Sequence, residues 1–447
     1  MALTGIEIFK LLPKTNCKEC GDPTCLAFAM KLAAGKVELS ACPYVSEEAK
    51  AKLSEASAPP IMPVTIGVGE RALKIGGETV MFRHEKRFDN KPGFAILISD
   101  TMTDAEIDSR LEKFKNLKYD RIGLTLQADL VAVKADSNDA SKFAAVVGKV
   151  KDGTDAGIIL MSTNPDVLAA GLKVCAERKP LLYAATEENL DKVAELAKGT
   201  CPVAVKAPDV EKLAELTNKL TSAGVKDIVL DSGSRNLRQA FNDQIIIRSA
   251  ALTKKFRPLG FPTIVFPGEM TDDPMKEAVI ASVFVAKYGG IIVLSDFQGE
   301  SLFPLLVERL NIYTDPQRPL ATTEGIYPIG EPKEDSPVLL TSNFSLTYFI
   351  VSGEIESSRV PSWLLVKDTE GLSVVTAWAA GKFVADTIAP FVKKCGIADK
   401  VKHHKLVIPG HAAPESGGLE EELADWEILV GPREGSNIPA YLKTWKP

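Results

Sequence analysis

Eight short apolar runs, each followed by an amphipathic stretch, occupy the middle of the chain. Continuous apolar runs predict parallel strands that are buried on both faces, and the stretches between them have the period of helices. Eight such units in roughly 210 residues match the size of a TIM (β/α)8 barrel, which we predict over residues 93–320. An open doubly wound sheet is the alternative, because periodicity does not reveal closure. The runs are residues 93–99, 121–127, 156–162, 180–185, 202–207, 227–232, 262–267 and 290–295.

Helix starts within this region carry their own signals. Asn164-Pro165 and Asp273-Pro274 each place an N-cap side chain before a proline at the first helical position. The cap accepts hydrogen bonds from free backbone N–H groups, and the proline lacks an N–H that would otherwise be left unpaired.

The regions on either side of the barrel have different rhythms. Residues 59–92 read as a linker followed by a β-hairpin around Gly76-Gly77. Residues 321–333 read as irregular, and a further α/β alternation follows up to residue 447. Its apolar runs predict a small parallel sheet with helices on both faces; these runs are residues 336–343, 362–368, 405–410 and 426–432.

Four of the seven cysteines, Cys17, Cys20, Cys25 and Cys42, lie close together near the start of the chain. Their pattern is C-x2-C-x4-C-x16-C with Pro43 after the last, and a predicted helix from Leu26 to Ala34 turns the chain back toward the first three. A single CxxC and a distant Cys-Pro favour an iron–sulfur cluster. A zinc site and ordinary thiols are the alternatives.

Composition limits the range of functions. The 447 residues exceed a single core, and the net charge of −6 without basic aromatic-rich clusters argues against nucleic acid as a partner. No apolar run is long enough to span a membrane, and the first residues do not resemble a signal peptide. Cys175, Cys201 and Cys395 are single and read as buried thiols, so we expect a cytoplasmic protein.

The turns after the strands of the last region are rich in Gly, Ser, Thr and Ala. Ligands of open α/β sheets bind beyond the carboxyl ends of strands, where such turns let the backbone approach closely. Neither GxGxxG nor GxxxxGK[ST] occurs, which disfavours a dinucleotide or a nucleoside triphosphate. The turns are residues 341–343, 368–373, 409–412 and 431–435.

Several segments together resemble the large (gamma) subunit of the corrinoid iron–sulfur protein of the acetyl-CoA (Wood–Ljungdahl) pathway. They are NCKECGDPTCLAFAMKLAAG, TSNFSLTYF, DTEGLSVVTAWAAGKF, VIPGHAA and VGPREG, and the resemblance extends over essentially the whole chain. It implies a [4Fe-4S] cluster domain over residues 1–58, a TIM barrel over 93–320 and a Rossmann-like corrinoid-binding domain over 321–447.

The resemblance also implies roles for residues. The cluster ligands would be Cys17, Cys20, Cys25 and Cys42. The cobalamin-type corrinoid would contact the turns of the last domain, for which we expect Thr341, Thr347, Gly371, Leu372, Ser373, Val374, Thr376, Gly410 and Arg433.

The implied function is that of a corrinoid methyl carrier. Co(I) would accept a methyl group from methyltetrahydrofolate, or a related methyltetrahydropterin, through a methyltransferase and donate it to acetyl-CoA synthase. The cluster would reduce inactive Co(II). The implied partners are a small TIM-barrel subunit in a heterodimer, the methyltransferase and carbon monoxide dehydrogenase/acetyl-CoA synthase.

One missing motif agrees with this chemistry. The D-x-H-x-x-G motif, whose histidine ligates cobalt in better-known cobalamin modules, does not occur. Cobalt without a strong lower nitrogen ligand is easier to reduce to Co(I). His411, in the turn PGHAA, is predicted to be an exposed turn residue, although it could approach the cofactor.

Two other functions are compatible with the sequence. The barrel could be an enzyme in its own right, such as a pterin-dependent methyltransferase, since polar residues follow several strands: Asp100, Asn164, Asp231, Glu269 and Asp296. Helix capping is the commoner role for such residues. The chain could also be a zinc-stapled interaction scaffold. Residues 54–63 and 321–333 are candidate hinges, or simply ordered connectors.

Overall fold

The computed structural model describes residues 5–33, 37, 39–46, 49, 53, 59–121, 124–315 and 320–447. The chain divides into two compact units. The first comprises Met1–Met81, Asp89–Leu111 and Asp129–Phe297, and the second comprises Phe82–Phe88, Glu112–Ala128 and Gln298–Pro447.

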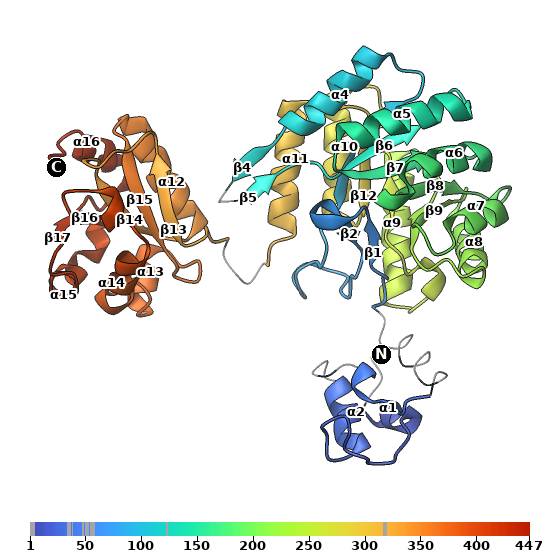
Figure 1. Cartoon of the computed structure of the whole chain (residues 1–447), viewed down its shortest axis with the longest axis horizontal. Helices are drawn as coiled ribbons and strands as arrows, with labels where there is room; N and C mark the ends of the chain where they lie inside the picture. Colours follow the sequence, from blue (N-terminus) through green and yellow to red (C-terminus); the bar gives the residue numbers. More distant parts are fainter. Residues whose placement is uncertain are drawn as a thin grey trace. The chain divides into compact units, whose positions relative to one another are not determined.

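Eight parallel strands form the sheet of the first unit (Figure 1). An isolated parallel bridge between Leu230 and Thr263 links the two edges of this sheet, so the sheet is nearly closed and the prediction of a barrel, in place of an open sheet, is confirmed. In spatial order the strands are β10 (Ile228–Asp231), β9 (Val203–Lys206), β8 (Leu181–Ala185), β7 (Gly157–Met161), β6 (Leu130–Lys134), β3 (Gly93–Ser99), β12 (Ile291–Leu294) and β11 (Ile264–Val265).

The second barrel strand is not the one that the sequence suggested. Of the predicted run 121–127, Arg121 and Leu124–Leu126 belong to an antiparallel pair of strands, β4 (Tyr119–Arg121) and β5 (Leu124–Leu126), outside the eight-stranded sheet. The barrel position belongs to β6, whose residues 130–133 are all fully buried. A strand covered on both faces needs a continuous apolar run, whereas Leu124 and Thr125 are exposed.

The helices of the barrel region begin as predicted where caps were identified. The Asn164 side chain accepts from the Asp166 N–H, and the Asp273 side chain accepts from the Met275 and Lys276 N–H groups. The helices are α4 (Asp104–Asn116), α5 (Ala140–Gly153), α6 (Pro165–Cys175), α7 (Leu190–Ala197), α8 (Val210–Ser222), α9 (Leu237–Leu252), α10 (Pro274–Ala286) and α11 (Gly299–Ile312). Short 3-10 turns lie at Ala176–Arg178, Arg257–Leu259 and, as η5, at Pro267–Glu269.

A hairpin closes the amino-terminal end of the barrel. Strands β1 (Val64–Ile66) and β2 (Leu73–Ile75) pair antiparallel, and their apolar side chains join the interior cluster of the barrel. The predicted hairpin exists, but its turn spans residues 67–72, including the 3-10 turn η2 (Gly69–Arg71), rather than Gly76-Gly77. Gly76 instead lies against the carbonyl group of Met62. A Cβ atom at position 76 would be only 2.3 Å from that carbonyl oxygen.

The last region forms a five-stranded sheet in the order β13-β15-β14-β16-β17. Strands β14 (Val338–Ser342), β15 (Ser362–Lys367), β16 (Lys405–Ile408) and β17 (Glu427–Val430) are parallel, as predicted. Strand β13 (Gly325–Ile329) is antiparallel at the edge, so the expectation of an irregular segment over 321–333 was wrong. Tyr327 and Ile329 pack against this sheet's core, which stabilises the segment as a strand.

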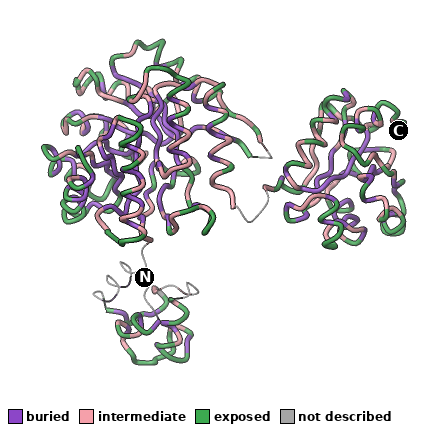
Figure 2. The backbone as a smooth tube through the Cα atoms, turned by 180° about the vertical axis from the view of Figure 1, so that it is seen from behind, coloured by how far each residue is buried: buried purple, intermediate pink, exposed green. Residues whose placement is uncertain are grey.

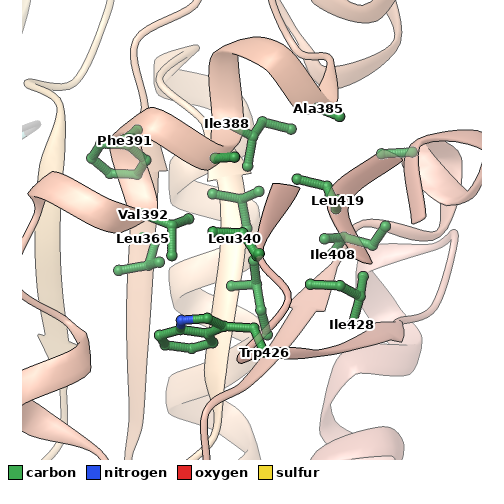
Figure 3. Packing of buried hydrophobic residues seen from close by; sticks show 14 of the residues in the cluster. Leu340, Leu365, Ala385, Ile388, Phe391, Val392, Ile408, Leu419, Trp426 and Ile428 are labelled. Atoms are coloured by element: carbon green, nitrogen blue, oxygen red, sulfur yellow. The ribbon is translucent and has the colours of Figure 1, made fainter. Parts of the chain in front are cut away.

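Helices cover both faces of this sheet. On one face, α14 (Ala385–Lys394) and α15 (Ser416–Glu422) pack on Leu340, Leu365 and Ile408 (Figure 3). On the other face, Leu339, Leu364 and Val407 form a second cluster. Helices α12 (Ser345–Ser358) and α16 (Ile438–Leu442) belong to that second cluster, α13 (Val374–Ala379) belongs to the first, and 3-10 turns lie at Ala398–Lys400, Gly410–Glu415 and Gly435–Asn437.

The cysteine module has a small core of its own. Helices α1 (Gly5–Leu11) and α2 (Cys25–Ala33) pack together with the 3-10 turn η1 (Leu39–Ala41), and Phe28 and Ala29 are fully buried. Buried residues are concentrated in this core and in the two sheets (Figure 2). The helix predicted over residues 26–34 is confirmed as far as Ala33. Residue 34 lies outside the described residues.

Among the described residues, no helix is both long and apolar enough to cross a membrane.

Candidate cofactor-binding sites

A pocket of about 240 Å³ opens at the carboxyl ends of β14 and β16. Strand β15 lies on one side of β14, and β16 lies on the other side. The order of the strands therefore reverses between the neighbouring strands β14 and β16. Open α/β sheets bind ligands at such a switch point. The pocket is lined by Leu339, Leu340, Thr341, Thr347, Ile350, Val351, Ser373, Val374, Val375, Val407, Ile408, Pro409, His411, Gly431, Pro432, Arg433, Gly435 and Ile438.

Five of the nine residues expected to contact the corrinoid line this pocket: Thr341, Thr347, Ser373, Val374 and Arg433. They come from the end of β14, the first turn of α12, the start of α13 and the turn after β17. The fold therefore brings together residues that are up to 92 positions apart in the sequence.

The other four residues are not part of the lining. Leu372 packs against the core on the α14 face, and Thr376 is exposed, with its hydroxyl 3.0 Å from that of Ser373. Gly371 has a φ of +76°, which glycine adopts without strain. Gly410 touches the turn after β17, where a Cβ atom would lie 2.6 Å from the Gly431 carbonyl oxygen.

Two hydroxyl groups at the end of β14 are buried without a partner. Thr341 is 1% exposed and Ser342 is fully buried, and among the described residues neither side-chain oxygen has a hydrogen-bond partner. A buried, unpaired polar group costs about 1–3 kcal/mol. Thr341 also lines the pocket, so a ligand with a polar atom at the pocket wall would satisfy its hydroxyl.

The apolar walls of the pocket were not anticipated from the sequence. Ile350 and Val351 come from α12, and Ile438 begins α16. Ile350 lies four residues after Leu346 on α12, and both side chains are about half exposed. Two large exposed apolar residues at this spacing are the signal that could have marked the wall.

The side chain of Asn343 connects two of the predicted turns. Its Oδ1 accepts hydrogen bonds from the Thr369 N–H (3.0 Å), the Thr369 hydroxyl (2.9 Å) and the Gly371 N–H (3.0 Å). Its Nδ2 donates to Asp368 Oδ1 at 2.8 Å. The amide therefore fixes the turn after β15 to the end of β14.

His411 is exposed, as expected, and it also lines the pocket. The other two histidines of this region have structural contacts. His403 lies between the Ser336 carbonyl and the Lys405 N–H, and His404 stacks on Trp426 with ring centroids 5.0 Å apart.

In the cysteine module, Cys20, Cys25 and Cys42 belong to one apolar cluster, while Cys17 is exposed. The Asn16 N–H donates to the Cys25 sulfur at 3.4 Å, and the Cys25 N–H donates to Asn16 Oδ1 at 2.8 Å. Hydrogen bonds to ligand sulfurs tune iron–sulfur clusters. Within the described residues, no group of three or more His, Cys, Asp or Glu side chains is placed to hold a metal ion.

An ion pair network lies at the carboxyl end of the barrel. Arg235 donates to both oxygens of Asp231 (3.1 and 2.9 Å) and pairs with Glu269, while the Tyr183 hydroxyl donates to Asp231 at 2.6 Å. Burial and the nearby Asp231 carboxylate raise the pKa of Tyr183 well above its usual value, so the phenol stays protonated. Asp231 and Glu269 are thus both bound to Arg235.

The remaining polar residues at the strand ends also have local partners. Asp100 accepts from the Ser137 N–H and hydroxyl (2.9 and 2.5 Å), and Asn164 caps α6. Asp296 accepts from the Phe297 N–H at 2.7 Å. Asn164 therefore has the helix-capping role that is the commoner one for such residues.

Comparisons with known proteins identify related families. Residues 63–442 match the family described as CO dehydrogenase/acetyl-CoA synthase delta subunit, and residues 12–44 match one described as putative Fe-S cluster. The corrinoid/iron-sulfur protein large subunit of Moorella thermoacetica is 46% identical over 444 residues, or 99% of each chain. The acetyl-CoA decarbonylase/synthase complex subunit gamma of Methanopyrus kandleri is 38% identical, covering 99% of this chain and 97% of that one.

Among solved structures, 7,8-dihydropteroate synthase from Vibrio fischeri ES114 matches with a TM-score of 0.39 and 13% identity, covering 56% of this chain and 99% of that chain.

A four-cysteine module, a (β/α)8 barrel and an α/β sheet with a pocket at its switch point define a multidomain protein with two separate candidate cofactor sites. The chain belongs to the family of corrinoid/iron–sulfur protein large subunits, which includes the gamma subunits of the archaeal acetyl-CoA decarbonylase/synthase complexes.

Proposed function

We propose that this chain is a methyl carrier that holds a corrinoid in its last domain and a [4Fe-4S] cluster in its first. The observation that carries the proposal is the buried, unpartnered Thr341 hydroxyl in the wall of an apolar pocket at the switch point. Full-length similarity to a corrinoid/iron-sulfur protein supports it.

The proposed division of the chain follows from the two sites. Residues 1–58 would form the cluster domain, residues 59–92 the linker and hairpin, and residues 93–320 the barrel. Residues 321–447 would form a Rossmann-like corrinoid-binding domain, a proposal supported by the order of its four parallel strands and the helices on both faces.

The size of the pocket indicates how a corrinoid would be held. Pockets for drug-sized ligands have volumes of roughly 300–1,000 Å³, and a corrinoid is larger than such ligands. A pocket of about 240 Å³ can hold only part of it. The rest would lie outside the pocket and need a second cover, which a small TIM-barrel subunit would supply in a heterodimer.

The residues of the pocket position the cofactor rather than react. When bound, the corrinoid would supply a cobalt centre that takes a methyl group from a methyltetrahydropterin, such as methyltetrahydrofolate, and passes it to acetyl-CoA synthase. Thr341 can hydrogen-bond a polar group inside the pocket, and Val374, Ile350 and Ile438 exclude water there. Arg433 lies exposed at the rim and can pair with an acidic or amide group outside it.

The cysteine module would supply the electron that restores oxidised cobalt. Cys17, Cys20, Cys25 and Cys42 are the proposed ligands, and their thiol chemistry suits iron. The hydrogen bond from Asn16 to the Cys25 sulfur would stabilise the thiolate form.

The experiment that tests this proposal is anaerobic purification with iron, cobalt and zinc analysis and an absorption spectrum. We expect iron, cobalt, a broad band near ~400 nm and corrinoid bands. A colourless protein with one zinc ion would support the scaffold alternative and contradict the carrier.

The proposed partners are the small subunit, a methyltransferase and carbon monoxide dehydrogenase/acetyl-CoA synthase, all in the cytoplasm. The methyltransferase and the synthase both need the same face of cobalt, so they should bind in turn. Excess methyltransferase should therefore slow methyl delivery to the synthase. Simultaneous binding with undiminished transfer would contradict a single shuttling cobalt.

A further inference from the structure

The turn between β15 and α13 has an unusual backbone that needs support. Glu370 and Gly371 are consecutive residues with φ values of +57° and +76°. The left-handed conformation is unfavourable for a residue with a side chain, so Glu370 keeps it only where neighbouring contacts impose it. Residues 373 and 374, which follow after Leu372, line the pocket.

Asn343 provides most of that support from within the fold. Its side chain is buried, with 4% of the residue exposed, and it makes four hydrogen bonds to residues 368–371. The outer side of the turn is held by Glu324, whose Oε2 accepts from the Asp368 N–H at 2.7 Å and from Lys367 Nζ at 2.7 Å.

We propose that Asn343 is a positioning residue for corrinoid binding, an inference that rests on the proposed function of this domain. Its amide sets the place where Ser373 and Val374 meet the cofactor. Asn343 does not line the pocket itself, so its effect acts through the turn.

The direction of the hydrogen bonds requires an amide at this position. Oδ1 must accept three bonds, and Nδ2 must donate to the Asp368 carboxylate. An aspartate at position 343 would keep the accepting oxygen but place a second carboxylate against Asp368. The two would repel when both are ionised, and one shared proton would remove the repulsion.

The other charged groups around this turn are already paired. Lys367 pairs with Glu324, and Lys382 pairs with Glu370. A pH-dependent binding defect that appears only in the variant would therefore originate in the new carboxylate pair.

The test uses the full-length chain freed of cobalt, with aquacobalamin as the probe and absorbance as the readout. Asn343→Asp should weaken binding by about tenfold or more at pH 8, since a buried hydrogen bond becomes a repulsion. The defect should shrink as the pH falls toward 5.5. The double variant Asn343→Asp/Asp368→Asn restores a donor opposite an acceptor but loses the bond that Asp368 Oδ1 accepts from the Glu370 N–H at 2.9 Å, so it should recover part of the affinity.

Asn218→Asp, at an exposed position on α8, is the matched control and should bind like the natural chain. Thermal melting of each variant separates positioning from folding, because a purely structural role would lower the melting temperature and the affinity together at every pH. Unchanged affinity in Asn343→Asp, or a defect that neither low pH nor the double variant relieves, would overturn the inference. Failure of the natural chain to bind aquacobalamin even with the small subunit present would instead overturn the proposed function.

Discussion

At the scale of single residues, the ion pair between Glu78 and Arg248 is buried, so removing either charge should strongly lower the stability of the fold. The atoms lie 3.3 Å apart and the side chains are 7% and 6% exposed. Arg248 also donates to the Val80 carbonyl at 2.6 Å and lies over the Tyr288 ring. Burial raises the pKa of Glu78 despite the nearby Arg248, so desolvation is the larger effect.

Glu78→Ala should destabilise the barrel by about 3–5 kcal/mol, because it leaves the guanidinium buried without its counter-charge. The barrel transition in a thermal melt measures this. Glu187→Ala removes a carboxylate from an exposed pair with Lys212 and should leave the transition unchanged. Equal effects of the two substitutions would contradict the argument.

Glu277 gives a stability effect with a defined pH dependence. Burial raises its pKa, although the Ser295 N–H and hydroxyl donate to it at 2.6 and 2.5 Å. A raised folded-state pKa favours folding below the unfolded value and loses that contribution as the pH rises through the folded value. Glu277→Gln keeps hydrogen-bond partners for Ser295 without a charge. The melting temperature of this variant should therefore rise relative to that of the natural chain as the pH increases from 4 to 7. A constant difference across this range would contradict the assignment.

The assignment of the cysteines as cluster ligands predicts an effect on metal content. Cys20→Ala should lower the iron content while leaving the cobalt content largely intact, because the two cofactors are proposed to occupy separate domains. Methyl transfer from pre-reduced protein should persist, and reactivation of oxidised cobalt should fail. Metal analysis and a reactivation assay measure these effects. A full iron complement with normal reactivation would show that Cys20 is not a ligand.

Individual elements show where sequence reasoning succeeds. Seven of the eight expected barrel runs are barrel strands because each is a continuous apolar run between amphipathic helices. The prediction of a barrel strand at residues 121–127 was wrong because their composition is typical of a strand but does not show whether both faces are buried. The strand that is buried on both faces is Leu130–Lys134. Strand β13 was missed because an edge strand containing Pro328 has little apolar periodicity and depends on β15 for its pairing.

The β1–β2 hairpin should be essential to the barrel, because its side chains fill the amino-terminal end. Ile66 is fully buried within the barrel cluster, so Ile66→Ala should cost about 2–5 kcal/mol. Thr65→Ala, at the exposed neighbouring position of the same strand, should have little effect. Chemical denaturation of both variants tests this, and a small effect at Ile66 would show that the hairpin is dispensable.

For the whole molecule, the sequence predicts sites that depend on local patterns better than sites that depend on distant contacts. Thr341 and Arg433 could be proposed because turns after parallel strands meet at one edge. Ile350 and Ile438 could not, since only the packing of α12 and α16 brings them to the pocket. The role of Asn343 likewise depends on a turn 25 or more residues away.

The measurement that tests the central claim most directly is the iron and cobalt content of a chain shortened to residues 1–320. The proposed cluster ligands remain in it, whereas the pocket at the ends of β14 and β16 is lost. We predict that iron is retained and cobalt is absent. Cobalt retained at the level of the full-length chain would place the corrinoid outside the last domain and contradict the account.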